Sequence, residues 1–180
     1  PGDRLTAELA TSKGGVAIAW GSVGFHETVK MKHKRKIGPL FHPISFATWS
    51  SFEEQADFDE DYDLSIICSD YDPRKSFINA LLPKLKEANV KVYYNTKKNL
   101  PYVSYLKLLA ASKIGLNFNW VPGFTDKYQL NARNFETMFA GSMLIAQPCY
   151  GLNLYVQDGV DYISFCDVND LFNKIIFYLR

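Results

Sequence analysis

The sequence has few of the features that mark secreted proteins, membrane-spanning proteins or proteins with a structural metal site. Cysteine is scarce: Cys68, Cys149 and Cys166 are odd in number and lack the paired spacing of a zinc site or a disulfide framework. No apolar run approaches the ~20 residues that a membrane-spanning helix needs. The first residues contain no apolar core of the kind found in a signal peptide. We therefore expect a cytoplasmic chain with reduced thiols and no membrane span.

Net charge is almost absent as well. The 20 Lys and Arg residues balance 19 Asp and Glu residues, which leaves a formal charge of +1. This balance excludes a general electrostatic attraction to nucleic acids or anionic membranes. Charge is concentrated locally in a cationic run at 30–36 and an acidic run at 52–63. We interpret both as solvated loops or faces. The two runs could instead pair with each other, and contact with a phosphate-rich partner is a further alternative for the cationic run.

Short apolar runs alternate with helical patterns from residue 63 onward. Apolar and aromatic residues make up 47% of the 180 residues, which is enough for one domain with a core. We predict strands at 64–68, 91–94, 114–118, 143–146 and 162–165, after an isolated strand at 16–20. We predict helices at 74–88, 102–112, 129–140 and 170–179. This alternation indicates an α/β fold with a Rossmann-like, doubly wound parallel sheet over residues 63–180.

Three residues are expected to set the limits of these helices. Pro83 should kink or divide the first helix, because proline lacks a backbone N–H. Asp167 or Asn169 can cap the last helix.

No G-x-G-x-x-G motif follows the strands at 16–20 or 64–68, which disfavours a redox protein that binds a dinucleotide.

The stretch at 131–148, NARNFETMFAGSMLIAQP, combines a helix with a short apolar strand. Phe135, Met138 and Phe139 recur at helical spacing, so we predict that they share one face of the helix. The opposite, polar face is predicted to hold Arg133, Glu136, Thr137 and Ala140. Because ligands of α/β sheets bind where strands meet helices, this cation and this carboxylate are candidate site residues. A crossover helix with a solvated polar face is the alternative.

This stretch resembles the C-terminal half of GT-B glycosyltransferases. The pattern R-x-F-E-T-M-x-A-G at 133–141 precedes an apolar strand, as E-A-M-A-x-G-x-P-V-I-A does in retaining members. A phage DNA-modifying glucosyltransferase carries the similar R-x-W-E-T-M-A. The resemblance covers residues 62–179. It implies a donor domain that binds a nucleoside-diphosphate sugar.

The resemblance also implies roles for the residues of the motif. Glu136 corresponds to the carboxylate that accepts hydrogen bonds from the ribose hydroxyls of the donor, although a surface glutamate is the alternative. Arg133 corresponds to a residue associated with the donor diphosphate, and a salt bridge to Glu136 is its alternative role. Tyr102 and Val103 lie in the region that reads the base.

The loop after the first strand of the domain is the second expected part of the donor site. Ser69, Arg74 and Lys75 match the loop and cations that hold the diphosphate in the resembling enzymes. A helix that begins at Arg74 would add the positive end of its dipole. Asp70 and Asp72 replace the expected glycines and could hold a divalent cation, although the fold itself requires no cofactor. Asp-x-Asp also occurs in GT-A glycosyltransferases, which form a rival interpretation.

Other catalytic residues stay unassigned. Tyr128 stands where retaining families have a second glutamate, eight positions before Glu136, so stereochemistry cannot be assigned. His26, His33 and His42 are candidate bases by residue type alone.

Together these features predict a glycosyltransferase, or its donor-binding domain. The acceptor is unassigned and could be a saccharide, lipid, protein or DNA. A non-catalytic module that binds a nucleotide or nucleotide sugar is the alternative. We interpret residues 1–62 as a linker or the remnant of an acceptor domain. We therefore expect a second domain or chain to supply the acceptor site, and this chain alone to bind donor without transferring sugar.

Overall fold

The computed structural model describes residues 18–19, 38–39, 61–96, 100–149 and 151–180. Two short segments near the start, β1 (Ile18–Ala19) and β2 (Gly38–Pro39), pair in parallel. Only β1 falls within the strand predicted at 16–20. The cationic run at 30–36, almost all of the acidic run and the three histidines lie outside the described residues. The predictions for those residues therefore stay predictions.

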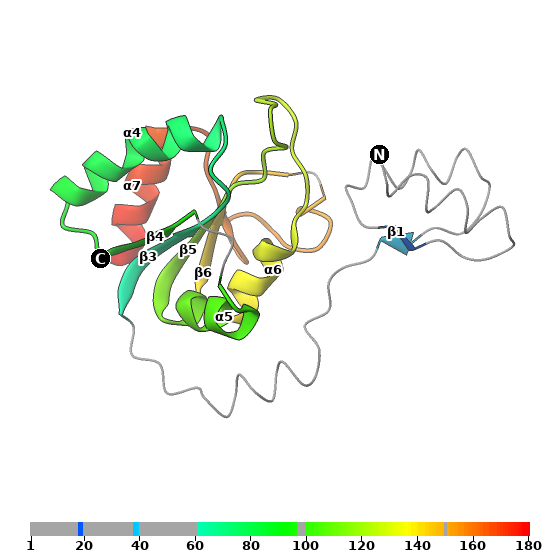
Figure 1. The fold of residues 1–180 in the computed structure, drawn as a ribbon, viewed down its shortest axis with the longest axis horizontal. Helices are drawn as coiled ribbons and strands as arrows, with labels where there is room; N and C mark the ends of the chain where they lie inside the picture. Colours follow the sequence, from blue (N-terminus) through cyan, green and yellow to red (C-terminus); the bar gives the residue numbers. More distant parts are fainter. Residues whose placement is uncertain (1–17, 20–37, 40–60, 97–99, 150) are drawn as a thin grey trace, which may run out of the picture.

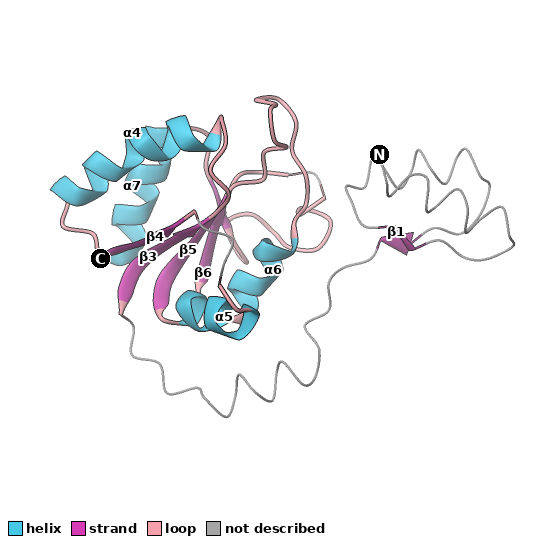
Figure 2. Cartoon of the chain, viewed as in Figure 1, coloured by secondary structure: helices cyan, strands magenta, loops and turns pink. Residues whose placement is uncertain are grey.

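A five-stranded parallel sheet forms the centre of the domain, and it confirms the predicted Rossmann-like α/β fold (Figures 1 and 2). Its spatial order is β4-β3-β5-β6-β7. The strands are β3 (Tyr62–Ile67), β4 (Val92–Asn95), β5 (Ser112–Asn117), β6 (Met143–Ala146) and β7 (Ile163–Ser164). β3 and β5 are neighbouring interior strands and are mostly buried, as expected for parallel strands with helices on both faces of the sheet.

Helices cover both faces of the sheet. They are α4 (Arg74–Glu87), α5 (Tyr102–Ala110), α6 (Ala132–Phe139) and α7 (Val168–Leu179). α4 and α7 pack together on one face, and α5 and α6 lie side by side on the other (Figure 1). Within the described ranges, none of these helices has the length and apolar character needed to cross a bilayer.

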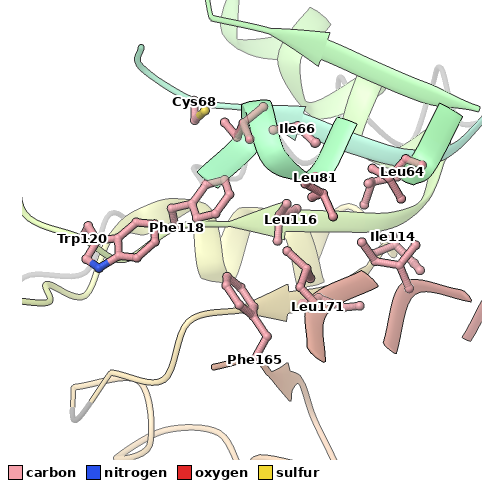
Figure 3. Packing of buried hydrophobic residues seen from close by; sticks show 14 residues of the cluster. Leu64, Ile66, Cys68, Leu81, Ile114, Leu116, Phe118, Trp120, Phe165 and Leu171 are labelled. Carbon is pink, nitrogen blue, oxygen red and sulfur yellow. The ribbon is translucent and has the colours of Figure 1, made fainter. Parts of the chain in front are cut away.

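The main core lies between the sheet and the α4–α7 pair (Figure 3). Leu64, Ile66, Ile114 and Leu116 alternate along β3 and β5 and meet Leu81 of α4. Phe118 and Trp120 extend this core past the carboxyl end of β5, and their rings stack with centroids 5.7 Å apart. The core therefore continues under the loop that follows β5 and holds that loop against the sheet.

Two residues of the predicted polar face of α6 are buried. Thr137 is 1% and Ala140 8% exposed, so this side of the helix is not simply a solvated face. Phe135 and Met138 pack with residues of β6, and Phe139 packs in the cluster that contains Ile67 of β3. Thr137 is buried because Gly115 in β5 lets α6 approach so closely that an added Cβ would overlap its Cγ2 atom.

Two helix limits agree with the sequence. α4 begins at Arg74 as predicted, and Asp167 caps α7 by accepting hydrogen bonds from the N–H groups of Asn169 and Asp170. Pro83 lies inside α4, which runs on to Glu87, so Pro83 does not divide the helix, and the kink stays a prediction. Pro83 lies on an exposed part of the helix, where water can satisfy the carbonyl that loses its partner.

Candidate functional site

The carboxyl edge of the sheet is where the topology places the candidate site. The chain moves outward from β3 to β4 and then returns to β5 on the other side of β3. In open α/β sheets, ligands bind outside the carboxyl ends of the strands at such a reversal of strand order. The loops after β3 and β5 flank this point, and both carry residues of the predicted site.

Arg74 ties these two loops together. Its Nη2 donates hydrogen bonds to the carbonyl oxygens of Phe118 and Trp120 at 3.0 and 3.1 Å. Its guanidinium carbon lies 4.3 Å from the ring centroid of Tyr71, whose hydroxyl donates to the Trp120 carbonyl at 2.9 Å. Arg74 is only 6% exposed. The predicted diphosphate-binding arginine is therefore a buried cation that also holds the loops in place.

The other predicted residues of this loop face outward. Lys75 pairs with Asp70 at 3.8 Å, and Ser69 is half-buried. Asp72 accepts hydrogen bonds from the hydroxyl and the backbone N–H of Ser76, which lower the pKa of its carboxyl group. Both carboxylates proposed for a cation therefore have protein partners. Within the described ranges, no three His, Cys, Asp or Glu side chains gather as a metal site would require.

Glu136 occupies the space between α6 and α5. Tyr102 donates its hydroxyl to Oε1 of Glu136 and Tyr105 donates its hydroxyl to Oε2, both at 2.9 Å. Tyr102 is exposed and Val103 half-buried in the first turn of α5, whereas Tyr105 is buried. Sequence reasoning missed Tyr105, although its spacing of three from Tyr102 places both on one helical face.

Arg133 lies one turn before Glu136 on α6 and contacts the ring of Tyr105. Its guanidinium carbon is 5.9 Å from the ring centroid of Tyr105, within cation–π range. Two tyrosines bond the Glu136 carboxylate, in place of the salt bridge to Arg133 that the sequence left as an alternative.

The charges of Arg74 and Arg133 affect each other. Burial lowers the pKa of the Arg74 guanidinium, and the charge of Arg133 lowers it further. The two arginines are therefore close enough to repel each other.

Three buried polar atoms in this region have no hydrogen-bond partner. They are Nε of Arg74, Oδ1 of Asn117 and Nε of Arg133. Every other buried side-chain nitrogen or oxygen in the described part of the chain has a hydrogen-bond partner. Burying an unpaired polar atom costs free energy, so such atoms are rare and call for an explanation. All three residues lie at the carboxyl edge of the sheet or in the first turn of a helix that follows it.

A network of buried amides underlies α6, and sequence reasoning missed it. Nδ2 of Asn117 donates to the side-chain oxygens of Asn119, Asn131 and Asn134. Asn119 in turn donates to the backbone carbonyl of Gln147 after β6. These contacts fix the start of α6 to the carboxyl ends of β5 and β6. The motifs N-x-N at 117–119 and N-x-x-N at 131–134 were the signals that could have revealed the network.

The strand order, the helices on both faces and the charged carboxyl edge define a Rossmann-like domain of the kind that forms the C-terminal half of GT-B glycosyltransferases. Comparison with protein families makes the assignment specific: the chain belongs to the glycosyl transferase-like family, whose model matches residues 53–180. No curated protein matches the chain in sequence. The family match covers the five-stranded sheet and all the residues predicted for the donor site.

Proposed function

We propose that the carboxyl edge of this sheet binds a nucleoside-diphosphate sugar, and that the domain is the donor half of a glycosyltransferase. Membership of the family supports glycosyl transfer in general. One observation carries the choice of donor: two arginines have unpaired, buried Nε atoms, and one of them, Arg133, lies one turn of α6 before a carboxylate that two tyrosines hold in place. Cations suit a diphosphate, and an oriented carboxylate suits a ribose.

Arg133 is our choice for the direct contact with the diphosphate. It is half-buried, and its Nε lacks a protein partner. The guanidinium group offers donors in a planar fork that matches phosphate oxygens, and an unpaired buried donor gains most from such a partner. Arg74 is more deeply buried, so it supports this contact mainly through its charge, together with the exposed Lys75 and the half-buried Ser69.

Glu136 is our choice for the ribose contact. Each oxygen of its carboxylate accepts one hydrogen bond from a tyrosine. A carboxylate has about four acceptor positions, so one position on each oxygen is left for the two hydroxyls of a cis-diol. The base would then lie beside the first turn of α5, near Tyr102 and Val103.

The chemistry required of such a site is electrostatic. Sugar transfer breaks the bond between the anomeric carbon and the diphosphate oxygen, and the diphosphate leaves with the electron pair. The acceptor atom forms the new bond to the anomeric carbon and releases its proton to water or to a base. Arg133 and Arg74 would stabilise the negative charge that develops on the diphosphate, and stabilisation of this kind is the main source of rate enhancement in many enzymes. Because Asp70 and Asp72 have protein partners, we propose that donor binding requires no divalent cation.

Titration with matched nucleotides and nucleosides tests this proposal. A thermal-shift screen over UDP, GDP, ADP and their sugars comes first, because a ligand at 100 times its dissociation constant stabilises a protein by about 2.7 kcal/mol. Calorimetry then compares Arg133→Ala with the control Lys86→Ala, an exposed cation on α4. Arg133→Ala should weaken binding of the diphosphate about tenfold or more and leave nucleoside binding almost unchanged. Equal losses for both ligands would contradict the phosphate role.

The ribose role is tested by Glu136→Ala. We expect a loss of roughly 1.5–3 kcal/mol in donor affinity, because a charged hydrogen-bond acceptor is removed. Glu87→Ala, at the exposed end of α4, is the matched control. A folded Glu136→Ala variant with wild-type affinity would remove Glu136 from the site. Turnover of a labelled donor onto any acceptor would distinguish a transferase from a module that only binds the nucleotide sugar.

A further inference from the structure

One side chain of α5 contacts both α6 residues on which the proposed donor site depends. Tyr105 donates its hydroxyl to Oε2 of Glu136 at 2.9 Å, and its ring lies 5.9 Å from the guanidinium carbon of Arg133. Glu136 and Arg133 lie on consecutive turns of a single short helix. Tyr105 is therefore placed where it can fix both side chains relative to each other.

Tyr105 is itself firmly held. It is 8% exposed and packs with Ile67 of β3, Leu106 and Leu109 of α5, and Ala140 after α6. A side chain locked by such packing has few alternative rotamers, so the groups that it contacts also lose freedom. Tyr102 makes the matching hydrogen bond to Oε1 but is 43% exposed, so it constrains the carboxylate less.

The hydroxyl of Tyr105 acts as a donor at neutral pH. Burial raises its pKa and the charge of Glu136 raises it further, while Arg133 works in the opposite direction. The net shift is upward, so the phenol stays protonated. A protonated phenol that donates to one oxygen of Glu136 leaves the remaining acceptor positions of that oxygen facing a fixed direction.

We propose that Tyr105 is a positioning residue, which orients the Glu136 carboxylate toward the ribose diol and holds Arg133 toward the diphosphate of a nucleoside-diphosphate donor. This inference rests on the proposed function of the site. It adds a residue that does not itself contact the donor. It also distinguishes the hydroxyl, which bonds Glu136 and also interacts with Arg133, from the ring, which contacts Arg133.

Two substitutions separate these contributions. Tyr105→Phe removes the hydroxyl and keeps the ring, whereas Tyr105→Leu removes both. The probes are the nucleoside diphosphate that binds best in the screen of UDP, GDP and ADP, its 2′-deoxy form and its nucleoside. Urea unfolding of each variant shows that the fold is kept, and Tyr102→Phe is the matched control for loss of a hydroxyl bonded to the same carboxylate.

Tyr105→Phe should weaken binding of the ribose diphosphate about tenfold, because an oriented hydrogen-bond acceptor is lost. It should change binding of the 2′-deoxy form about twofold or less, since that ligand lacks the diol. Tyr105→Leu should weaken both, because Arg133 also loses its support. The double variant Glu136→Gln/Tyr105→Phe should bind the donor almost as the single variant Glu136→Gln does. This is the result expected for two residues that act together.

Equal losses for the ribose and 2′-deoxy ligands on Tyr105→Phe would show a merely structural role and overturn the inference while the proposed function stands. A larger loss for Tyr102→Phe than for Tyr105→Phe would also overturn it. If the wild-type chain binds no nucleoside diphosphate, the proposed function itself fails, and this inference fails with it.

Discussion

At the scale of single residues, Arg74 has a structural role that its position in the sequence does not reveal. Its Nη2 satisfies the carbonyls of Phe118 and Trp120, and the side chain is buried over Tyr71. The resemblance to GT-B enzymes implies only contact with the donor diphosphate. The geometry adds a structural role, so substitutions here are expected to affect stability as well as binding.

Arg74→Met should lower the free energy of unfolding by roughly 1.5–3 kcal/mol, because hydrogen bonds from a charged donor to two carbonyls are lost. Urea unfolding measures this change. Lys75→Met, at the neighbouring exposed position, is the control and should stay within about 0.5 kcal/mol of the wild type. A stable Arg74→Met variant that has lost diphosphate affinity would instead support a role restricted to the ligand.

At the scale of elements, the distance between α6 and β5 is set by one glycine. Gly115 lies beneath Thr137, and a methyl group added there would overlap Cγ2 of that threonine. α6 carries both Arg133 and Glu136, so this contact also sets how far the site residues stand from the carboxyl edge. Backbone approach of this kind is a recognised use of glycine inside a strand.

Gly115→Ala should destabilise the protein by roughly 1–3 kcal/mol, as overpacking of a dense core does. Thr137→Ser removes the methyl group that the new Cβ would meet. The double variant should therefore be more stable than the sum of the two single changes predicts, and a double-mutant cycle in urea measures the difference. Strict additivity would show that the two residues are not in steric conflict.

Sequence patterns predicted the elements better than they predicted how α6 is placed. The buried parallel strands are rich in apolar residues, so the sheet and the residues after its strands could be found. Apolar periodicity, however, gives no weight to a buried amide or threonine, and so it did not show that Asn134 and Thr137 are buried in α6. Tyr105 was missed because its partner Glu136 lies 31 residues further on, a contact that only the tertiary fold creates.

At the scale of the whole molecule, Asp63 joins three strands at the edge opposite the site. Its Oδ2 accepts a hydrogen bond from the backbone N–H of Lys91 before β4, and its Oδ1 accepts one from Lys113 of β5, both at 2.9 Å. Partial burial raises the pKa of Asp63, but these bonds and the two positive charges outweigh it. The pKa therefore falls below its usual value of 3.8.

Asp63→Asn should lower the stability at pH 7 by about 1 kcal/mol or less, since the ion pair is partly exposed. Because the folded pKa is depressed, the charged form contributes stability above pH 3.8 that is lost as pH falls through the folded pKa. The difference between wild type and variant should therefore shrink in urea unfolding at about pH 3. Glu87→Gln should match the wild type at pH 7, and a constant difference for Asp63→Asn at all pH values would refute this linkage.

The pairing of β3 with β5 also has a consequence for how the chain folds. Leu64 lies opposite Ile114, so the two central strands must meet across a long stretch of sequence that contains α4, β4 and α5. Parallel pairing over such a separation is slow, because closing the loop costs conformational entropy before the stabilising native contacts have formed. The loops after β3 and β5, which carry the candidate site, come together only after that encounter. We therefore expect a ligand of the proposed donor site to bind late intermediates or the native state, and so to slow unfolding more than it speeds folding.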